Sequence, residues 1–279
     1  MESPFLAYEP WVRIGIFALT LVAMLLWELA APRRVLAHAR RLRWLPNLAL
    51  AALNAFLPRI VLPTTAVGLA ILGQEQGWGL FNQLPIPPAV ASVVAVIALD
   101  LAIYIQHVLF HAVPVLWRLH RMHHADLDFD TTTGVRFHPL EALLSAGIKL
   151  AVVAALGPSP LAVVTFEVLL SATAMFNHGN VRLPGTVDRL LRWAVVTPDM
   201  HRIHHSAVPR ETNSNFGFNL SWWDRLFGTY REDPALGHER IVIGLRQFRD
   251  RGDLALGSML LQPFRSADDS LGGPQHRPG

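Results

Sequence analysis

The chain has 279 residues, of which 52% are hydrophobic and only 16% charged, and its mean hydropathy is +0.32. This composition is too apolar for an ordinary soluble domain and indicates an integral membrane protein. The sequence contains no cysteine, which excludes disulfides, iron–sulfur clusters, thiolate zinc sites and cysteine nucleophiles. The net charge is +3, and the arginines lie between apolar stretches without interleaved aromatic side chains, so no nucleic-acid partner is expected.

The first apolar segment, residues 11–31, has about 20 mostly apolar residues, enough to cross a hydrocarbon core of about 30 Å. The acidic N-terminus lacks the basic region and cleavage site of a secretory signal, so we expect this segment to be retained. Because an arginine cluster follows it at once, the positive-inside rule predicts a cytoplasmic loop and an N-terminus outside. The cluster consists of Arg33, Arg34, Arg40, Arg41 and Arg43.

Four further segments are expected to cross the membrane. Residues 47–72 are interrupted by polar residues and prolines, which leaves a kinked or partly re-entrant segment open. They are kept as a span because the loop after them has no lysine or arginine, whereas the next loop is basic. Residues 89–116 predict one long helix that projects past the bilayer on the cytoplasmic side. Residues 139–156 and 160–177 predict a helical hairpin that enters from the cytoplasm and returns.

Lys149 and Glu167 lie about equally far from the turn of this hairpin. They are expected either to pair inside the membrane or to be a snorkelling lysine and an unrelated carboxylate. The sequence alone leaves both alternatives open.

The expected fold class is all-α: a polytopic transmembrane helical bundle of about five membrane segments, with a cytoplasmic helical cap that carries a histidine-rich dinuclear metal site. The cap is expected after Arg182, where no segment is apolar for long enough to span. The expected organisation is transmembrane segments over 1–95, a catalytic domain over 96–235, a cytoplasmic C-terminal helical segment over 236–265 and a disordered tail over 266–279.

Histidine is the residue type that indicates a functional site in this sequence. Two HxxHH strings begin at His120 and His201, and an HxxxH begins at His107. At this histidine frequency roughly 0.03 HxxHH strings are expected by chance. Ten of the thirteen histidines fall between residues 107 and 205: His107, His111, His120, His123, His124, His138, His178, His201, His204 and His205.

Helical spacing brings these side chains together, because residues i and i+4 lie about 40° apart around a helix axis. Each string is therefore expected to act as a claw of two or three nitrogens. Imidazole binds iron, zinc, copper and nickel, and one ion takes four to six ligands, so eight or nine converging imidazoles predict two ions. The spans predicted from hydropathy and charge place all ten histidines at the same membrane face.

Asp100 and Tyr104 share a face of the third expected helix with His107 and His111. Asp100 lies about 10 Å deeper than His107, where a carboxylate either serves the metal site or makes a simple helix–helix hydrogen bond. Glu141 and Asp199 are weaker candidates for hydrogen-bond partners of the ligands.

These motifs resemble the fatty acid hydroxylase and sterol desaturase superfamily of membrane non-haem di-iron enzymes, over roughly residues 96–235. The resemblance rests on six segments: D-x3-Y-x2-H-x3-H from Asp100, WRLHRMHHAD from Trp117, RFHPLE from Arg136, NHGN from Asn177, TPDMHRIHH from Thr197 and NFGFNLSWWDRLFGTY from Asn215.

The resemblance implies a set of metal ligands, which are His107, His111, His120, His123, His124, His201, His204 and His205, with His178 as a ninth. For His138 the resemblance leaves two roles open: a residue that contacts the ligands, or an occasional ligand. We group it with Asp100 and Tyr104 as candidate catalytic residues. The last of the six segments is similar to the part that closes the site from the cytoplasm. Its apolar side chains by themselves predict an amphipathic interfacial patch: Trp222, Trp223, Leu226 and Phe227.

The implied chemistry is activation of O2 at two iron ions and attack on an unactivated C–H bond of a lipid, giving an alcohol or an alkene. The substrate is expected to enter from the bilayer between the third, fourth and fifth helices. A separate reductase is expected to supply the electrons, because the chain has no obvious fused donor module. The expected location is the inner or plasma membrane, with the site on the cytoplasmic face.

Two other classes of function remain open. A membrane metal transporter or sensor would need ligands along a crossing path, and a bis-imidazole cytochrome would need isolated axial histidines on facing helices. Metal stoichiometry and an absorption spectrum separate these alternatives from the oxygenase.

Overall fold

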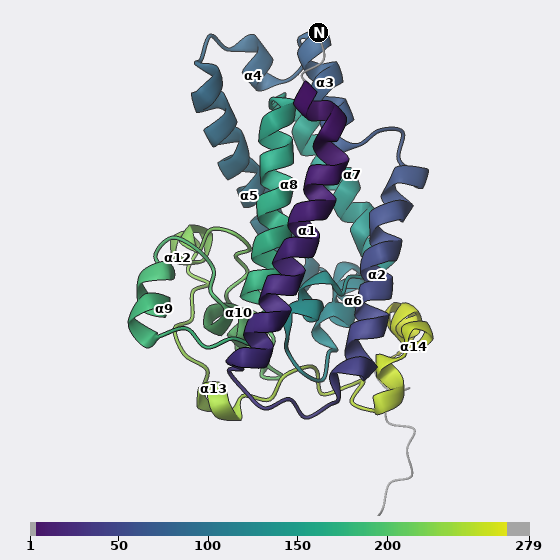
Figure 1. The fold of residues 1–279 in the computed structure, drawn as a ribbon, viewed down its shortest axis with the longest axis vertical. Coiled ribbons are helices and arrows are strands. Elements are labelled where there is room, and N and C mark those ends of the chain that lie inside the picture. Colours follow the sequence, from purple (N-terminus) through teal and green to yellow (C-terminus); the bar gives the residue numbers. More distant parts are fainter. Residues whose placement is uncertain (1–3, 267–279) are drawn as a thin grey trace, which may run out of the picture.

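The computed structural model describes residues 4–266. Every named secondary-structure element in this range is a helix (Figure 1). Five stretches of this range are long and apolar enough to cross a membrane, which confirms the all-α class and the expected number of spans. They are Tyr8–Ala30, Arg40–Gln83, Pro88–Ala112, Pro139–Leu156 and Pro160–Asn177. Of the predicted C-terminal tail, residues 267–279 lie outside the described range.

The long helices pack into one bundle, seen along its length in Figure 1. Helix α8 (Pro160–Asn177) contacts both α1 (Pro4–Ala30) and α5 (Pro88–Ala112), and α7 (Pro139–Leu156) contacts α5. Leu99 and other buried apolar side chains fill the space between these helices. The bundle therefore has a packed interior in addition to its apolar outer face.

The second expected span is broken in two. Helix α2 (Arg40–Val61) ends before the extended residue Leu62, and α3 (Ala66–Gln76) starts after Thr65, whose side chain accepts the N–H of Gly68 at 3.0 Å. Pro63 disfavours helical backbone at the residue before it, so the segment expected over residues 47–72 is a candidate span that is kinked at this point. A short helix, α4 (Leu80–Gln83), leads to the next span.

The third expected helix also ends early. Helix α5 stops at Ala112, Val113 is extended, and Pro114 starts a separate helix, α6 (Pro114–His124). Proline disfavours helical backbone at the residue before it and is well suited to a first helical position, so the single helix expected over residues 89–116 is wrong. The break lets α6, which carries the first HxxHH string, pack back against α5.

The predicted hairpin of α7 and α8 is confirmed, with Gly157 in the left-handed region at φ 63°. Lys149 pairs with Glu167 across the hairpin, which decides between the two alternatives in favour of a pair. Arg13 of α1 lies 2.7 Å from Glu167 and 2.6 Å from Glu9, so four charged residues form one cluster within the spans.

Short helices gather at the end of the bundle where α1 ends (Figure 1). We call this region the cap. Its helices are α9 (Gly185–Leu191), α10 (Pro198–His204), α11 (Pro209–Thr212), α12 (Trp222–Leu226), α13 (Gly237–Arg240) and α14 (Leu256–Leu261), with 3-10 turns η1 (Thr131–Val135), η2 (Arg251–Leu254) and η3 (Gln262–Phe264).

A buried ionic network fastens α2 to the loop that follows α6. Arg43 lies 2.6 Å from Asp126 and 2.5 Å from Asp130, and all three side chains are enclosed. Burial alone would raise the pKa of Asp126, but the guanidiniums of Arg43 and Arg136 outweigh it and hold this pKa well below its usual range. The network fixes the start of the loop that leaves the first HxxHH string.

Candidate metal centre

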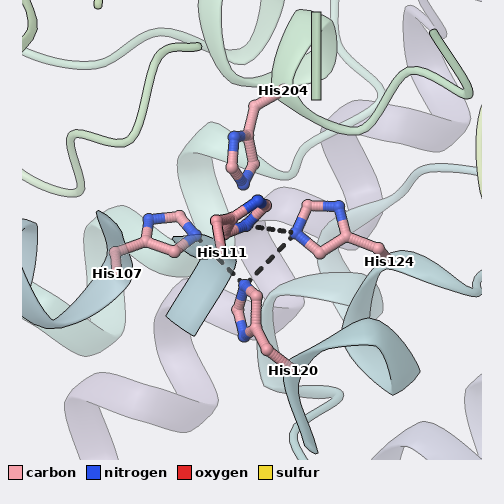
Figure 2. A group of neighbouring side chains, drawn as sticks. All are labelled: His107, His111, His120, His124 and His204. Carbon is pink, nitrogen blue, oxygen red and sulfur yellow. Dashed lines mark hydrogen bonds between the residues drawn. The ribbon is translucent and has the colours of Figure 1, made fainter. Parts of the chain in front are cut away.

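Nine buried or half-buried histidines converge in two groups. Within each group the ligating nitrogens lie within 4.8 Å of one another. The five-histidine group consists of His107, His111, His120, His124 and His204, whose rings point at a common centre in Figure 2. The four-histidine group consists of His123, His178, His201 and His205.

The inward atoms are Nε2 nitrogens at nearly uniform spacing. In the five-histidine group, His120 Nε2 lies 3.1 Å from that of His107 and 3.2 Å from that of His124. In the other group, His178 Nε2 lies 3.1 Å from those of His201 and His205. Ligands at right angles around an ion, with metal–nitrogen bonds of about 2.1 Å, are about 3.0 Å apart. The donor set of each group therefore fits one cation.

Each HxxHH string is divided between the two groups. The i, i+4 pairs converge as expected: His120 and His124 belong to the five-histidine group, and His201 and His205 belong to the four-histidine group. The third histidine of each string does not join its pair, because adjacent helical residues point about 100° apart. His123 belongs to the four-histidine group and His204 to the five-histidine group.

The outward nitrogens are held by hydrogen bonds from the surrounding chain. The Nδ1 atoms of His107 and His204 lie 2.7 and 2.8 Å from the carbonyl oxygens of Phe216 and Ser214. A carbonyl can only accept, so each Nδ1 carries the proton and each Nε2 turns its lone pair inward. This is the tautomer that a metal ligand needs.

Glu141 provides the carboxylate of the site. Its Oε1 lies 2.6 Å from His120 Nδ1, as expected for a partner that orients a ligand. The corresponding expectation for Asp199 is wrong, because Asp199 pairs with Arg33 and Arg202 and contacts no histidine of either group. Glu141 alone of the two candidates therefore serves the histidines.

Burial disfavours the protonated form of several of these histidines. Burial lowers the pKa of His123, His124 and His204 well below the usual range, and neighbouring histidines lower it further. Burial also lowers the pKa of His178, to about 3. Only His111 is partly exposed among the nine. Neutral imidazoles are ready to bind a cation without first losing a proton.

Two of the candidate catalytic residues hold part of the cap against α5. Asp100 accepts hydrogen bonds from Trp223 Nε1 at 2.9 Å and from Asn219 Nδ2 at 2.8 Å. The hydroxyl of Tyr104 lies 2.9 Å from that of Thr229. Within residues 4–266, no hydrogen bond joins either residue to a histidine, and their catalytic role stays a prediction.

His138 lies in neither histidine group. Its Nδ1 accepts the N–H of Leu140 at the start of α7, and its Nε2 lies 3.2 Å from the carbonyl oxygen of Leu260 near the C-terminal end of α14. The geometry places it as a link between two helices, and a catalytic role for it stays a prediction.

Sequence reasoning missed Glu28, a fully buried carboxylate near the end of α1. Its Oε1 accepts the backbone N–H groups of Thr131 and Asn180, both at 2.7 Å. These bonds tie the turn η1 to the segment just after His178. The only signal in the sequence is an acidic residue in the last turns of an apolar span, which does not name its partners.

Comparison with known proteins agrees with this geometry. Residues 92–229 match the sequence profile of the fatty acid hydroxylase family. An ornithine lipid hydroxylase from Rhizobium tropici is 31% identical over 182 residues, which cover 64% of this chain and 51% of the relative. An alkylglycerol monooxygenase from Xenopus tropicalis is 29% identical over 150 residues, or 53% of this chain and 31% of the relative.

A human cholesterol 25-hydroxylase is 28% identical over 138 residues, which cover 47% of this chain and 48% of the relative. The chain thus spans about half or less of the length of the curated relatives it matches. No solved structure matches it. From the profile match and these relatives, the chain belongs to the fatty acid hydroxylase superfamily.

Proposed function

We propose that this chain is a membrane-bound di-iron oxygenase that uses O2 to hydroxylate an unactivated C–H bond of a lipid. The observation that carries the proposal is the convergence of nine Nε2 atoms in two groups, each of the size of one ion's ligand shell. The three relatives described above are named as hydroxylases or monooxygenases of different lipids, which supports hydroxylation over desaturation.

The nine histidines would hold the two ions. Imidazole accepts several metals, and the family resemblance favours iron among them. When bound, the two irons would supply the activation of O2, with electrons from a separate donor protein. The chain itself orients the ligands through Glu141 and the carbonyls of Phe216 and Ser214.

Aromatic rings around the histidines exclude water from the centre. Phe137 stacks on His123 at 4.5 Å between centroids, Phe218 lies 5.6 Å from His107, and Phe129 lies 5.5 Å from His178. A site closed in this way strengthens electrostatic interactions and limits side reactions with water.

An open apolar groove of about 510 Å³ runs along α7 and suits a lipid tail. It is lined by Leu140, Leu143, Leu144, Gly147, Ile148 and Ala151. Glu141, the partner of His120, lies in the first turn of the same helix. We propose that an acyl or sterol tail follows α7 toward the five-histidine group.

The arginine cluster after α1 supports an orientation with the metal centre on the cytoplasmic face of the inner or plasma membrane and the N-terminus outside. On this proposal the catalytic unit comprises residues 96–235, preceded by membrane segments over 1–95 and followed by a helical segment over 236–265.

The test uses the full chain in lipid nanodiscs, loaded with ferrous iron under reducing conditions. We expect two irons per chain, no Soret band, and incorporation of 18O from 18O2 into one lipid of a panel that includes ornithine lipids, alkylglycerols and sterols. Fewer than about two metals per well-folded chain would contradict the proposal. Two bound metals with no reductant-dependent use of O2 would favour a metal-binding or transport protein.

A further inference from the structure

An exposed apolar surface lies on the cap, apart from the metal centre. We call it the α9–α12 patch. It consists of Leu190 (72% exposed), Trp193 (64%), Trp222 (44%), Leu226 (70%) and Phe227 (53%). Large apolar side chains gathered in this way on a surface mark a contact with lipid or protein.

The two halves of the patch form one firm surface. Trp222 Nε1 donates to the carbonyl oxygen of Trp193 at 3.0 Å. The Arg225 guanidinium lies 4.3 Å above the Trp193 ring and donates to the carbonyl oxygen of Arg192. These bonds fix the end of α9 to α12, although the two helices are far apart in sequence.

The contacts of α12 with α5 show how far along this candidate span α12 lies. Trp223 donates to Asp100, and Phe227 stacks on Tyr104 with 5.4 Å between ring centroids. Asp100 lies midway along α5, about 18 Å from either end at the helical rise. A hydrocarbon core is about 30 Å thick, so α12 meets this candidate span within its length and not beyond its end.

The apolar surface continues from the patch onto the span. Ile105 and Leu109 of α5 are nearly half exposed. They come shortly after Asp100 and Tyr104 along the chain, the two residues that Trp223 and Phe227 contact. In Figure 1, α12 lies at the upper edge of the cap, toward the level of the long helices, and α13 lies at its lower end. Tryptophan together with arginine is the composition found where hydrocarbon meets headgroups.

We propose that the α9–α12 patch is immersed in the bilayer, at the boundary between hydrocarbon and headgroups in the leaflet nearest the histidines. Lipid is therefore its partner. The cap is held to the membrane by this surface as well as by the covalent ends of the spans.

A short series of hydrogen bonds connects the α9–α12 patch to the metal centre. Asp224 of α12 accepts the N–H groups of Phe216 and Gly217 at 2.7 and 2.8 Å. The carbonyl oxygen of Phe216 in turn holds His107 Nδ1. Immersion of α12 thus supports the segment that orients one of the histidines.

The absence of cysteine makes a direct test possible. Leu190→Cys and Leu226→Cys are labelled one at a time with a nitroxide in the full chain in nanodiscs of phosphatidylcholine and phosphatidylglycerol. The matched control is Leu236→Cys, because Leu236 is also half exposed but lies beside α13. We expect the ratio of relaxation by O2 to relaxation by a water-soluble nickel complex to be several-fold higher at residues 190 and 226 than at residue 236.

Equal ratios at the three positions would overturn the proposal, as would patch labels shielded from both reagents, which would indicate a protein partner such as a second copy. A second measurement needs no label. Wild-type tryptophan fluorescence should be quenched by phospholipids brominated near the headgroup, and Trp193→Phe with Trp222→Phe should remove part of that quenching. Unchanged quenching in the double variant would also overturn the proposal.

Discussion

Two clusters of polar side chains lie in this apolar protein, one partly buried and one almost fully buried, and they are completed in different ways. Glu9, Arg13, Lys149 and Glu167 form a cluster of two acids and two bases in which every charge has an opposite partner. The nine histidines instead turn ring nitrogens toward one another in two groups that could each hold a cation. The charged cluster is complete without a ligand, whereas the histidine cluster is arranged to bind one.

The difference shows why burial alone does not identify a functional site. Enclosed polar groups are stable when they are paired, and a self-paired cluster is explained by its role in fixing helices, here α1, α7 and α8. A set of enclosed acceptors of one kind is stable only with a partner from outside. The following changes separate the two clusters experimentally.

The largest effect is expected when a ligand is removed. His204→Ala should lower the metal content of purified protein from two ions to one or none, and O2-dependent activity should be lost, because His204 is one of five nitrogens around one position. Elemental analysis of desalted protein measures this. His138→Ala is the control and should keep both ions, since His138 lies in neither group; two ions in the His204 variant would refute the assignment.

Breaking the charged cluster should change stability and leave the metal in place. Glu167→Gln deprives Lys149 and Arg13 of a shared partner, at a cost of about 3 kcal/mol in the free energy of unfolding. Thermal unfolding in detergent, with metal analysis alongside, measures both quantities. Lys149→Met with Glu167→Leu should recover much of the loss because Arg13 keeps Glu9; a loss of metal in Glu167→Gln would contradict the separation of the clusters.

A change of one methyl group should disturb the support of the four-histidine group. A Cβ at Gly134 would lie 2.4 Å from the carbonyl oxygen of Ala174 and 3.1 Å from His178 Nδ1. Gly134→Ala should therefore cost about 1–3 kcal/mol and weaken metal retention. Gly147→Ala is the matched control, since nothing lies within 4 Å of its Cβ position. Equal melting temperatures and equal metal retention in the two variants would disprove this prediction.

The smallest effect is expected from the residue behind a ligand. Glu141→Gln removes the charge that holds His120 Nδ1 and should weaken metal binding about 10–100-fold without abolishing it. Competition with a chelator gives the affinity. Glu239→Gln changes an exposed carboxylate on the cap and should leave the affinity as it is; a matching loss there would show that the effect is not specific to Glu141.

The spans were predictable because hydropathy sums over many residues and tolerates local error. The prolines within residues 47–72 were recognised as interruptions, but the break at Pro114 was not predicted, although the restriction that proline places on the preceding residue is local and readable. Giving that restriction more weight than continuous hydropathy would have placed α6 as a separate helix.

The convergence of the histidines in the HxxxH and HxxHH strings was readable from spacing, whereas His178 was expected only from the family resemblance. The division of the cluster into two groups was not readable from the sequence. That division depends on how α6 and α10 face each other, which is a non-local property. Glu28 was missed for the same reason, because its partners Thr131 and Asn180 lie more than 100 residues away along the chain. Short-range patterns carry no information about such contacts.

The opposite division of the two HxxHH strings has a mechanical consequence. Neighbouring residues such as His123 and His124 belong to different groups, as do His204 and His205, so α6 and α10 each connect the two groups. A shift of either helix would therefore move ring nitrogens of both groups. Loss of one whole string would remove histidines from both groups, because each string contributes to both.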